Sequence, residues 1–193
     1  MTTIQFSKNY IGFCLSILFF ATGVAKAQSF EIIPQSAVVS IHGTSNVHDW
    51  DMKVTKVSSE LVVNPSKQIT ALTVKIPVTS IKSGKGIMDG KTYDAFDAKK
   101  NPNIVFQLTE ASPTKWSDKE SEITITGNLS LAGETRKISF KTLGKITKTG
   151  EYLLKGNVPL KMTDYKMIPP TAFFGTMKTG DAITVKFDVT FKG

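Results

Sequence analysis

The sequence predicts an all-β protein in which about eight antiparallel strands close into a barrel, with one short helix near the opening. Apolar and polar residues alternate through most of the chain, turn sequences separate the alternating runs at hairpin spacing, and one segment departs from the alternation. Strands joined by short turns pair antiparallel, and a long sheet that closes on itself leaves no exposed edge. These observations favour a closed barrel.

The last run of the chain shows the alternation most clearly. Its apolar residues fall on one face and its polar residues on the other, which is the pattern of a strand with one buried face. The apolar row is Ile183, Val185, Phe187, Val189 and Phe191. Similar rows occupy 72–78, 104–108 and 123–131, and a less regular one occupies 138–146. Gly127 lies on the buried side of its row, where a missing side chain relieves crowding.

Three turn sequences connect these runs. Asn64-Pro65-Ser66-Lys67 precedes the run 72–78. Residues 132–135 (Ala-Gly-Glu-Thr) separate the runs 123–131 and 138–146, and 148–151 (Lys-Thr-Gly-Glu) separate 138–146 from the run that follows it. All three are rich in the residues that turns favour.

Two segments break the alternation. In 81–100 the apolar residues have helical spacing, which predicts a short helix from Met88 to Ala98 that ends before Asn101-Pro102. In 164–180 the pair Pro169-Pro170 excludes regular structure. We expect these segments to form the entrance to the barrel, through Ile87, Met88, Tyr93, Phe96, Phe173 and Phe174.

Residues 1–27 have the pattern of a signal peptide. Lys8 precedes an apolar run over 11–21 that is too short to span a bilayer, and Ala25-Lys26-Ala27 offers small residues where a signal peptidase cleaves. We therefore expect removal of 1–27, a single barrel domain over 28–193, and export to the periplasm or the outside of the cell. The only cysteine, Cys14, would be removed, and the mature chain would contain no integral membrane segment.

The composition favours neither nucleic-acid binding nor catalysis. The net charge is +8, but the lysines are scattered and Arg136 is the only arginine, so we expect the charge to aid solubility. No cysteine nucleophile, glycine-flanked serine or phosphate loop is present. The carboxylates Asp89, Asp94 and Asp97 lie among lysines, as on a solvated surface.

One cluster has the composition of a metal site. It comprises His42, His48, Asp49 and Asp51. Two imidazoles without a third matched ligand make a weak zinc site, so we expect no metal and no cofactor.

Four segments, in order, resemble the YceI family of exported, lipocalin-like, eight-stranded barrels associated with polyisoprenoids. They are 36–54 (SAVVSIHGTSNVHDWDMKV), 75–107, 125–140 (ITGNLSLAGETRKISF) and 161–191. The chain departs from the family pattern in two places. It keeps Asp89 without the histidine that often follows, and 163–166 (Thr-Asp-Tyr-Lys) lacks the usual aspartate–arginine pair.

The resemblance implies that the protein is not an enzyme and that it binds, transports or stores a long-chain amphipathic lipid of the isoprenoid type inside the barrel. The residues expected to line the interior are Val74, Ile76, Phe106, Leu129, Phe140, Val185 and Phe187. The alternation alone is equally compatible with a solid core made of these residues. Two other functions stay open, a ligand-free structural or stress-related protein acting through surface contacts and a small lipocalin-like enzyme. The oligomeric state is also open, and a homodimer is compatible with the sequence.

Overall fold

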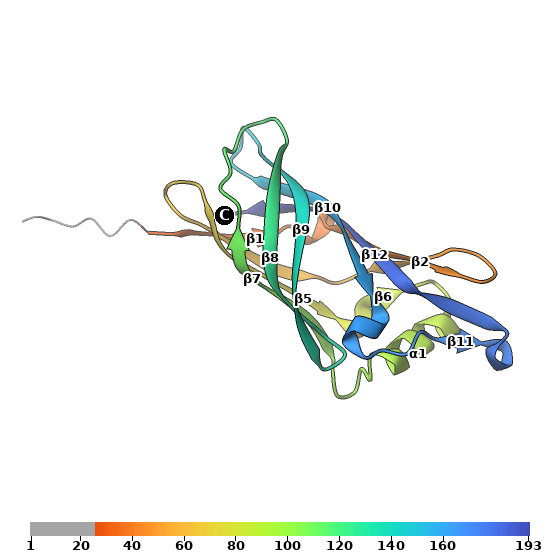
Figure 1. The fold of residues 1–193 in the computed structure, drawn as a ribbon. Coiled ribbons are helices and arrows are strands. Elements are labelled where there is room, and N and C mark those ends of the chain that lie inside the picture. The colour runs from red at the N-terminus through yellow and green to blue at the C-terminus, as the bar shows by residue number, and fades with distance from the viewer. Residues whose placement is uncertain (1–25) are drawn as a thin grey trace, which may run out of the picture.

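The computed structural model describes residues 26–193, apart from the side chain of Phe173, and confirms a closed antiparallel barrel of eight strands (Figure 1). Each strand pairs with the next in the ring, and the last strand, β12, returns to β1. The predicted signal peptide lies almost wholly in 1–25, outside the described residues. In spatial order the ring is β1 (Gln28–Ile32), β4 (Ser58–Val63), β5 (Ile69–Pro77), β7 (Asn103–Ala111), β8 (Ser121–Leu131), β9 (Glu134–Ile146), β10 (Tyr152–Lys161) and β12 (Met177–Lys192).

Three short strands extend one side of the barrel. β2 (Val38–Ser45) pairs with β12 and with β3 (Trp50–Val54), and β3 pairs with β6 (Ile81–Lys82). They are separated from β1, β4 and β5 by the 3-10 turn η1 (Pro34–Ser36), by 55–57 and by the turn η2 (Val78–Ser80). Hydrogen bonds continue across these breaks, from Ile33 N to the Thr190 carbonyl (2.8 Å) and from Thr55 N to the Ser80 carbonyl (2.8 Å). The wall is therefore continuous, and the breaks bend it.

β8 shows how the alternating sequence builds the interior. Ile123, Ile125, Leu129 and Leu131 are all buried on its inner face. Gly127 lies in the same row, and a Cβ atom there would stand 2.4 Å from the Phe106 ring and 2.4 Å from the Gln107 carbonyl. The glycine is thus required because the Phe106 ring occupies the space of its missing side chain.

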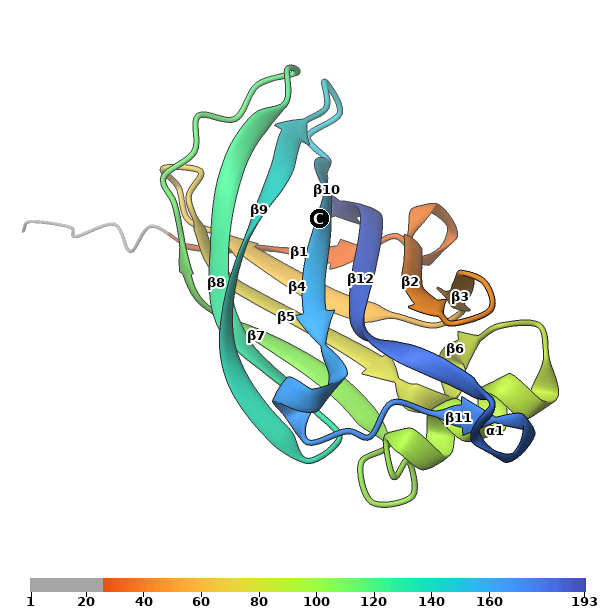
Figure 2. The same ribbon diagram turned by 45° about the vertical axis from the view of Figure 1, so that its right-hand side comes forward.

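The single α-helix of residues 26–193, α1 (Gly86–Ala95), begins and ends slightly earlier than the predicted 88–98. Phe96 caps it, and Asp97 then takes a left-handed backbone conformation (φ 46°), which ends the helix. No helix in residues 26–193 is long and apolar enough to cross a membrane. Figure 2 shows α1 across one end of the barrel, beside η3 (Met162–Tyr165), β11 (Thr171–Ala172) and η4 (Phe173–Gly175).

The opposite end of the barrel is packed shut. The rings of Phe30 and Trp116 each contact the Tyr152 ring edge-on, with centroids 4.7 Å apart in both pairs. Leu61 and Ile123 beside them have no solvent exposure. The barrel therefore has one filled end and one end bounded by α1.

Candidate functional site

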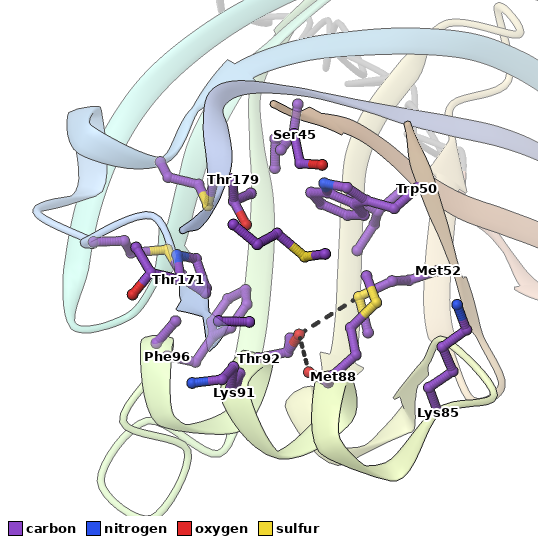
Figure 3. A pocket seen from close by; sticks show the side chains of 18 of the residues that line it. Ser45, Trp50, Met52, Lys85, Met88, Lys91, Thr92, Phe96, Thr171 and Thr179 are labelled. Atoms are coloured by element: carbon purple, nitrogen blue, oxygen red, sulfur yellow. Dashed lines mark hydrogen bonds between the residues drawn. The ribbon is translucent and has the colours of Figure 1, made fainter. Parts of the chain in front are cut away.

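A cavity of about 520 Å³ opens at the α1 end of the barrel, and we call it the mouth cavity (Figure 3). Its walls come from β2, β3, α1, η3, β11 and β12, so segments far apart in the sequence meet around it. Its volume falls within the roughly 300–1,000 Å³ that is usual for small-molecule sites.

A second, inner cavity of about 180 Å³ continues into the barrel. The two cavities adjoin, because five residues line both: Ile41, Phe96, Leu131, Leu160 and Ile183. The structure places all seven residues expected to line the interior on the inner cavity: Val74, Ile76, Phe106, Leu129, Phe140, Val185 and Phe187. Their role in binding a ligand stays a prediction.

Aromatic rings form a layer across the inner cavity. Phe140 contacts Phe106 and Phe187, with ring centroids 5.8 and 6.1 Å apart. Phe187 packs over Gly156, where an added Cβ would lie 3.0 Å from the ring. Val185 and Phe187 point inward but are only half-buried, because they face the cavity.

Methionine is the most frequent residue type in the lining of the mouth cavity. Of the six methionines in the chain, all five outside position 1 line it: Met52, Met88, Met162, Met167 and Met177. The Thr92 hydroxyl lies 3.0 Å from the Met88 carbonyl and 3.5 Å from the Met52 sulfur, which joins α1 to β3 (Figure 3). Thioethers are flexible and polarisable, so they adapt to apolar ligands of irregular shape.

Only some of the residues expected at the entrance line the mouth cavity. Ile87, Met88 and Phe96 line the mouth cavity. Tyr93 is not among its lining residues: its hydroxyl accepts from Lys82 Nζ (2.6 Å) and donates to the Thr79 carbonyl (3.1 Å) on the β6 side. Phe174 is fully exposed at the tip of the β11–β12 hairpin, and the side chain of Phe173 lies outside the described residues.

Few polar groups border the mouth cavity. Its formally charged lining residues are three lysines, Lys85, Lys91 and Lys161. The Tyr165 hydroxyl is buried and has no hydrogen-bond partner among residues 26–193, and burial raises the pKa of this phenol. The lining of the mouth cavity is therefore mostly apolar, and its formal charges are positive.

The YceI-like domain model matches residues 30–191, which is most of the chain. The protein belongs to the YceI family. Among curated proteins, none matches the sequence.

Solved structures share the YceI fold at low sequence identity. Burkholderia cenocepacia BcnA has a TM-score of 0.68 and 18% identity, over 82% of this chain and 98% of that one. A polyisoprenoid-binding domain from Saccharophagus degradans, implicated in plant cell wall breakdown, has a TM-score of 0.68 and 10% identity, over 85% and 98%. The Campylobacter jejuni YceI protein has a TM-score of 0.58 and 18% identity, over 100% and 99%. At these identities the likeness concerns the fold.

In this YceI-family chain the carboxylate that matches the family pattern is structural. Asp89 accepts hydrogen bonds from Ser83 N (2.7 Å) and Ser83 Oγ (2.6 Å), and Lys82 Nζ lies 3.9 Å away. These contacts, the Ser83 hydrogen bonds most of all, hold the pKa of Asp89 below its ordinary value of 3.8. The carboxylate thus fixes the 83–89 turn in its ionised form, and that form is a poor general acid near neutral pH.

The two histidines lie in separate settings. His42 Nδ1 lies 3.1 Å from Asp51, and its Nε2 lies 4.0 Å from Asp49, whereas His48 lines the mouth cavity. No group of three or more metal-ligating residues was found within 26–193. The four residues of the candidate metal cluster therefore do not converge on one point.

Proposed function

We propose that this protein binds a long-chain, largely apolar lipid of the isoprenoid type without catalysis, and carries or stores it. The observation that carries the proposal is the pair of adjoining apolar cavities, which run from the mouth past Leu160 and Ile183 to the aromatic layer. Water in such a space makes few hydrogen bonds, so its replacement by hydrocarbon is favourable.

The closed wall makes this interior available. Backbone groups of a closed barrel pair with neighbouring strands, so the inward surface is left to the side chains. Family membership and the polyisoprenoid-binding domain of Saccharophagus degradans support the same ligand class. We further propose that the lipid tail enters past α1 and that its polar end stays near the lysines of the mouth.

Tryptophan fluorescence offers a direct test. Trp50 lines the mouth cavity, and Trp116 belongs to the filled end, so a Trp116→Phe protein reports the mouth alone. The indole N–H of Trp116 is buried without a partner among the described residues, so its removal breaks no hydrogen bond. Titration with a C20 prenyl alcohol should shift Trp50 emission to shorter wavelength as lipid displaces water.

A filled inner cavity should change the chain length that fits. In the Trp116→Phe background, Val185→Phe should lower affinity for the C20 alcohol at least tenfold. The larger side chain would keep several methylenes of the tail out of the inner cavity, and each one loses roughly 0.8 kcal/mol of burial free energy. Affinity for a C10 alcohol, which fits the mouth cavity, should change less than twofold. Thr184→Phe, one residue along β12 and on the outer face, is the matched control.

Two results would count against the proposal. If saturating lipid leaves the Trp50 emission unchanged and extracts of the purified protein contain no lipid, the protein acts without an interior ligand. If Val185→Phe and Thr184→Phe alter C20 binding equally, the lipid lies outside the barrel.

A further inference from the structure

Large exposed apolar side chains gather around the mouth. Six such residues are exposed in the described part of the chain, and four of them lie at this end: Val47, Ile87, Ile168 and Phe174. Ile87 lines the mouth cavity itself, Val47 is next to the lining residue His48, and Ile168 is next to Met167. Phe174 lies between the lining residues Ala172 and Met177. These four residues form what we call the mouth rim.

The rim is assembled from separate segments that are tied together. The Asn46 side chain donates to the Thr176 carbonyl (2.8 Å) and accepts from Lys178 N (2.8 Å), which fixes the β2–β3 loop to the start of β12. Thr179 N donates to the Pro170 carbonyl (3.1 Å), which fixes the segment after Ile168 to the same strand. Figure 1 shows the β2–β3 loop, α1 and the β11–β12 hairpin at one end of the molecule.

Three of the four rim side chains are highly exposed to solvent. Ile87 is 82% exposed, Ile168 is 83% exposed and Phe174 is fully exposed. Phe174 also takes a left-handed backbone conformation (φ 57°), which bulky residues rarely adopt. An aromatic ring held outward at such a position gains nothing from the fold, which indicates a partner outside the chain.

Positive charge accompanies the rim. Lys85 and Lys91 line the mouth cavity, and Lys178 follows Met177 on β12. None of the seven ion pairs found within 26–193 includes these three lysines. Two nearby carboxylates are engaged, Asp89 by Ser83 and Asp181 by the Thr163 amide (2.8 Å) and hydroxyl (2.7 Å).

We propose that the mouth end docks on an anionic lipid surface, with the rim side chains in the interface and the unpaired lysines against the headgroups. Apolar tips flanked by lysines are the combination that anionic bilayers bind, since hydrophobic insertion and electrostatic attraction act together. The cavity would then open directly onto the bilayer. This goes beyond the proposed function, because docking does not require that the cavity take up lipid.

Vesicle sedimentation tests the docking. The protein should bind vesicles of phosphatidylglycerol and phosphatidylcholine in equal parts, and should bind pure phosphatidylcholine vesicles far more weakly. Ile87→Ser with Phe174→Ser should reduce binding about tenfold or more. Lys85→Glu with Lys178→Glu should reduce it by at least about fivefold per lysine at low salt, and less at high salt.

Two valines of similar exposure give a matched control. Val47 is 62% exposed on the rim, and Val38 is 65% exposed on β2, away from the mouth-lining residues. Val47→Ser should weaken vesicle binding severalfold, and Val38→Ser should leave it unchanged.

Three outcomes would overturn the docking proposal. They are no binding of the parent protein to anionic vesicles, equal effects of the two valine variants, and rim variants that alter only self-association in lipid-free solution, which would make the rim an interface between two copies. Val185→Phe separates this proposal from the first one, because it should impair C20 uptake and leave docking intact.

Discussion

The difference between the filled and the vacant end of the barrel can be measured with one substitution made at two places. Ile123 is fully buried at the filled end, where its Cδ1 occupies the space beside Gly144. Ile183 has the same side chain, but it is half-buried and lines both cavities. Ile→Ala at each position compares a packed environment with a vacant one.

The expected losses follow from what surrounds each side chain. At Ile123, removal of three carbons costs about 2.4 kcal/mol of transfer free energy, and the void left behind raises the total to roughly 3.5 kcal/mol. At Ile183 the same carbons already border a void, so no new cavity forms and the loss should be about 1 kcal/mol. For a domain of this size the melting temperature should fall by roughly 7–14 °C in the first case and 2–4 °C in the second.

Urea unfolding of lipid-extracted protein, followed by circular dichroism, measures both losses. If the proposed function holds, added C20 prenyl alcohol should stabilise the parent more than Ile183→Ala, since the variant has lost part of the cavity wall. Losses that agree within about 0.5 kcal/mol would refute the reasoning, because they would mean that the interior near Ile183 is packed as tightly as the filled end.

Two further predictions concern stability. Gly127→Ala should lower the free energy of unfolding by roughly 1–3 kcal/mol, because the added methyl collides with Phe106, whereas Gly90→Ala should raise it by about 0.5–1 kcal/mol, since a methyl group at this helical position meets nothing within 4 Å. Thermal melts that shift in the same direction for both glycines would contradict this. Asp89→Asn should lower stability above pH 3.8, and this difference should vanish as the pH falls through the depressed pKa of Asp89, because a carboxylate with a lowered pKa stabilises the fold only while ionised. Urea midpoints between pH 3 and 7 test it, and a difference that does not vary with pH would exclude the role given to Ser83.

The alternation of the sequence was sufficient for the barrel and its interior. In β8, and over 183–191 of β12, the strand period is uninterrupted, so the inward rows could be identified without knowledge of the register. The bends at η1 and η2 were not predicted, although Pro34 and Pro77 mark them, because hydrogen bonds across the breaks keep the pairing that the alternation implies.

The mouth was harder to predict, because periodicity does not describe irregular backbone. Met162, Tyr165 and Met167 belong to a 3-10 turn and the loop after it, and only their position around one cavity reveals a common role. Met88 and Thr92 of α1 and its C-cap Phe96 are spaced four residues apart and share the face toward the cavity, whereas Tyr93 falls on another face. Helical phase could therefore have separated Tyr93 from Phe96.

The inner cavity and the mouth cavity differ in stiffness. Phe106 and Phe187 are held by contact with glycine backbone, whereas the thioether chains of the mouth have three rotatable bonds each and can re-pack. If a lipid tail binds there, the inner cavity should consequently limit the length of tail that fits, whereas the mouth cavity should accept branched, kinked or cyclic groups. Such a protein would select a ligand strictly by its chain length and only loosely by the shape of the end that lies in the mouth cavity.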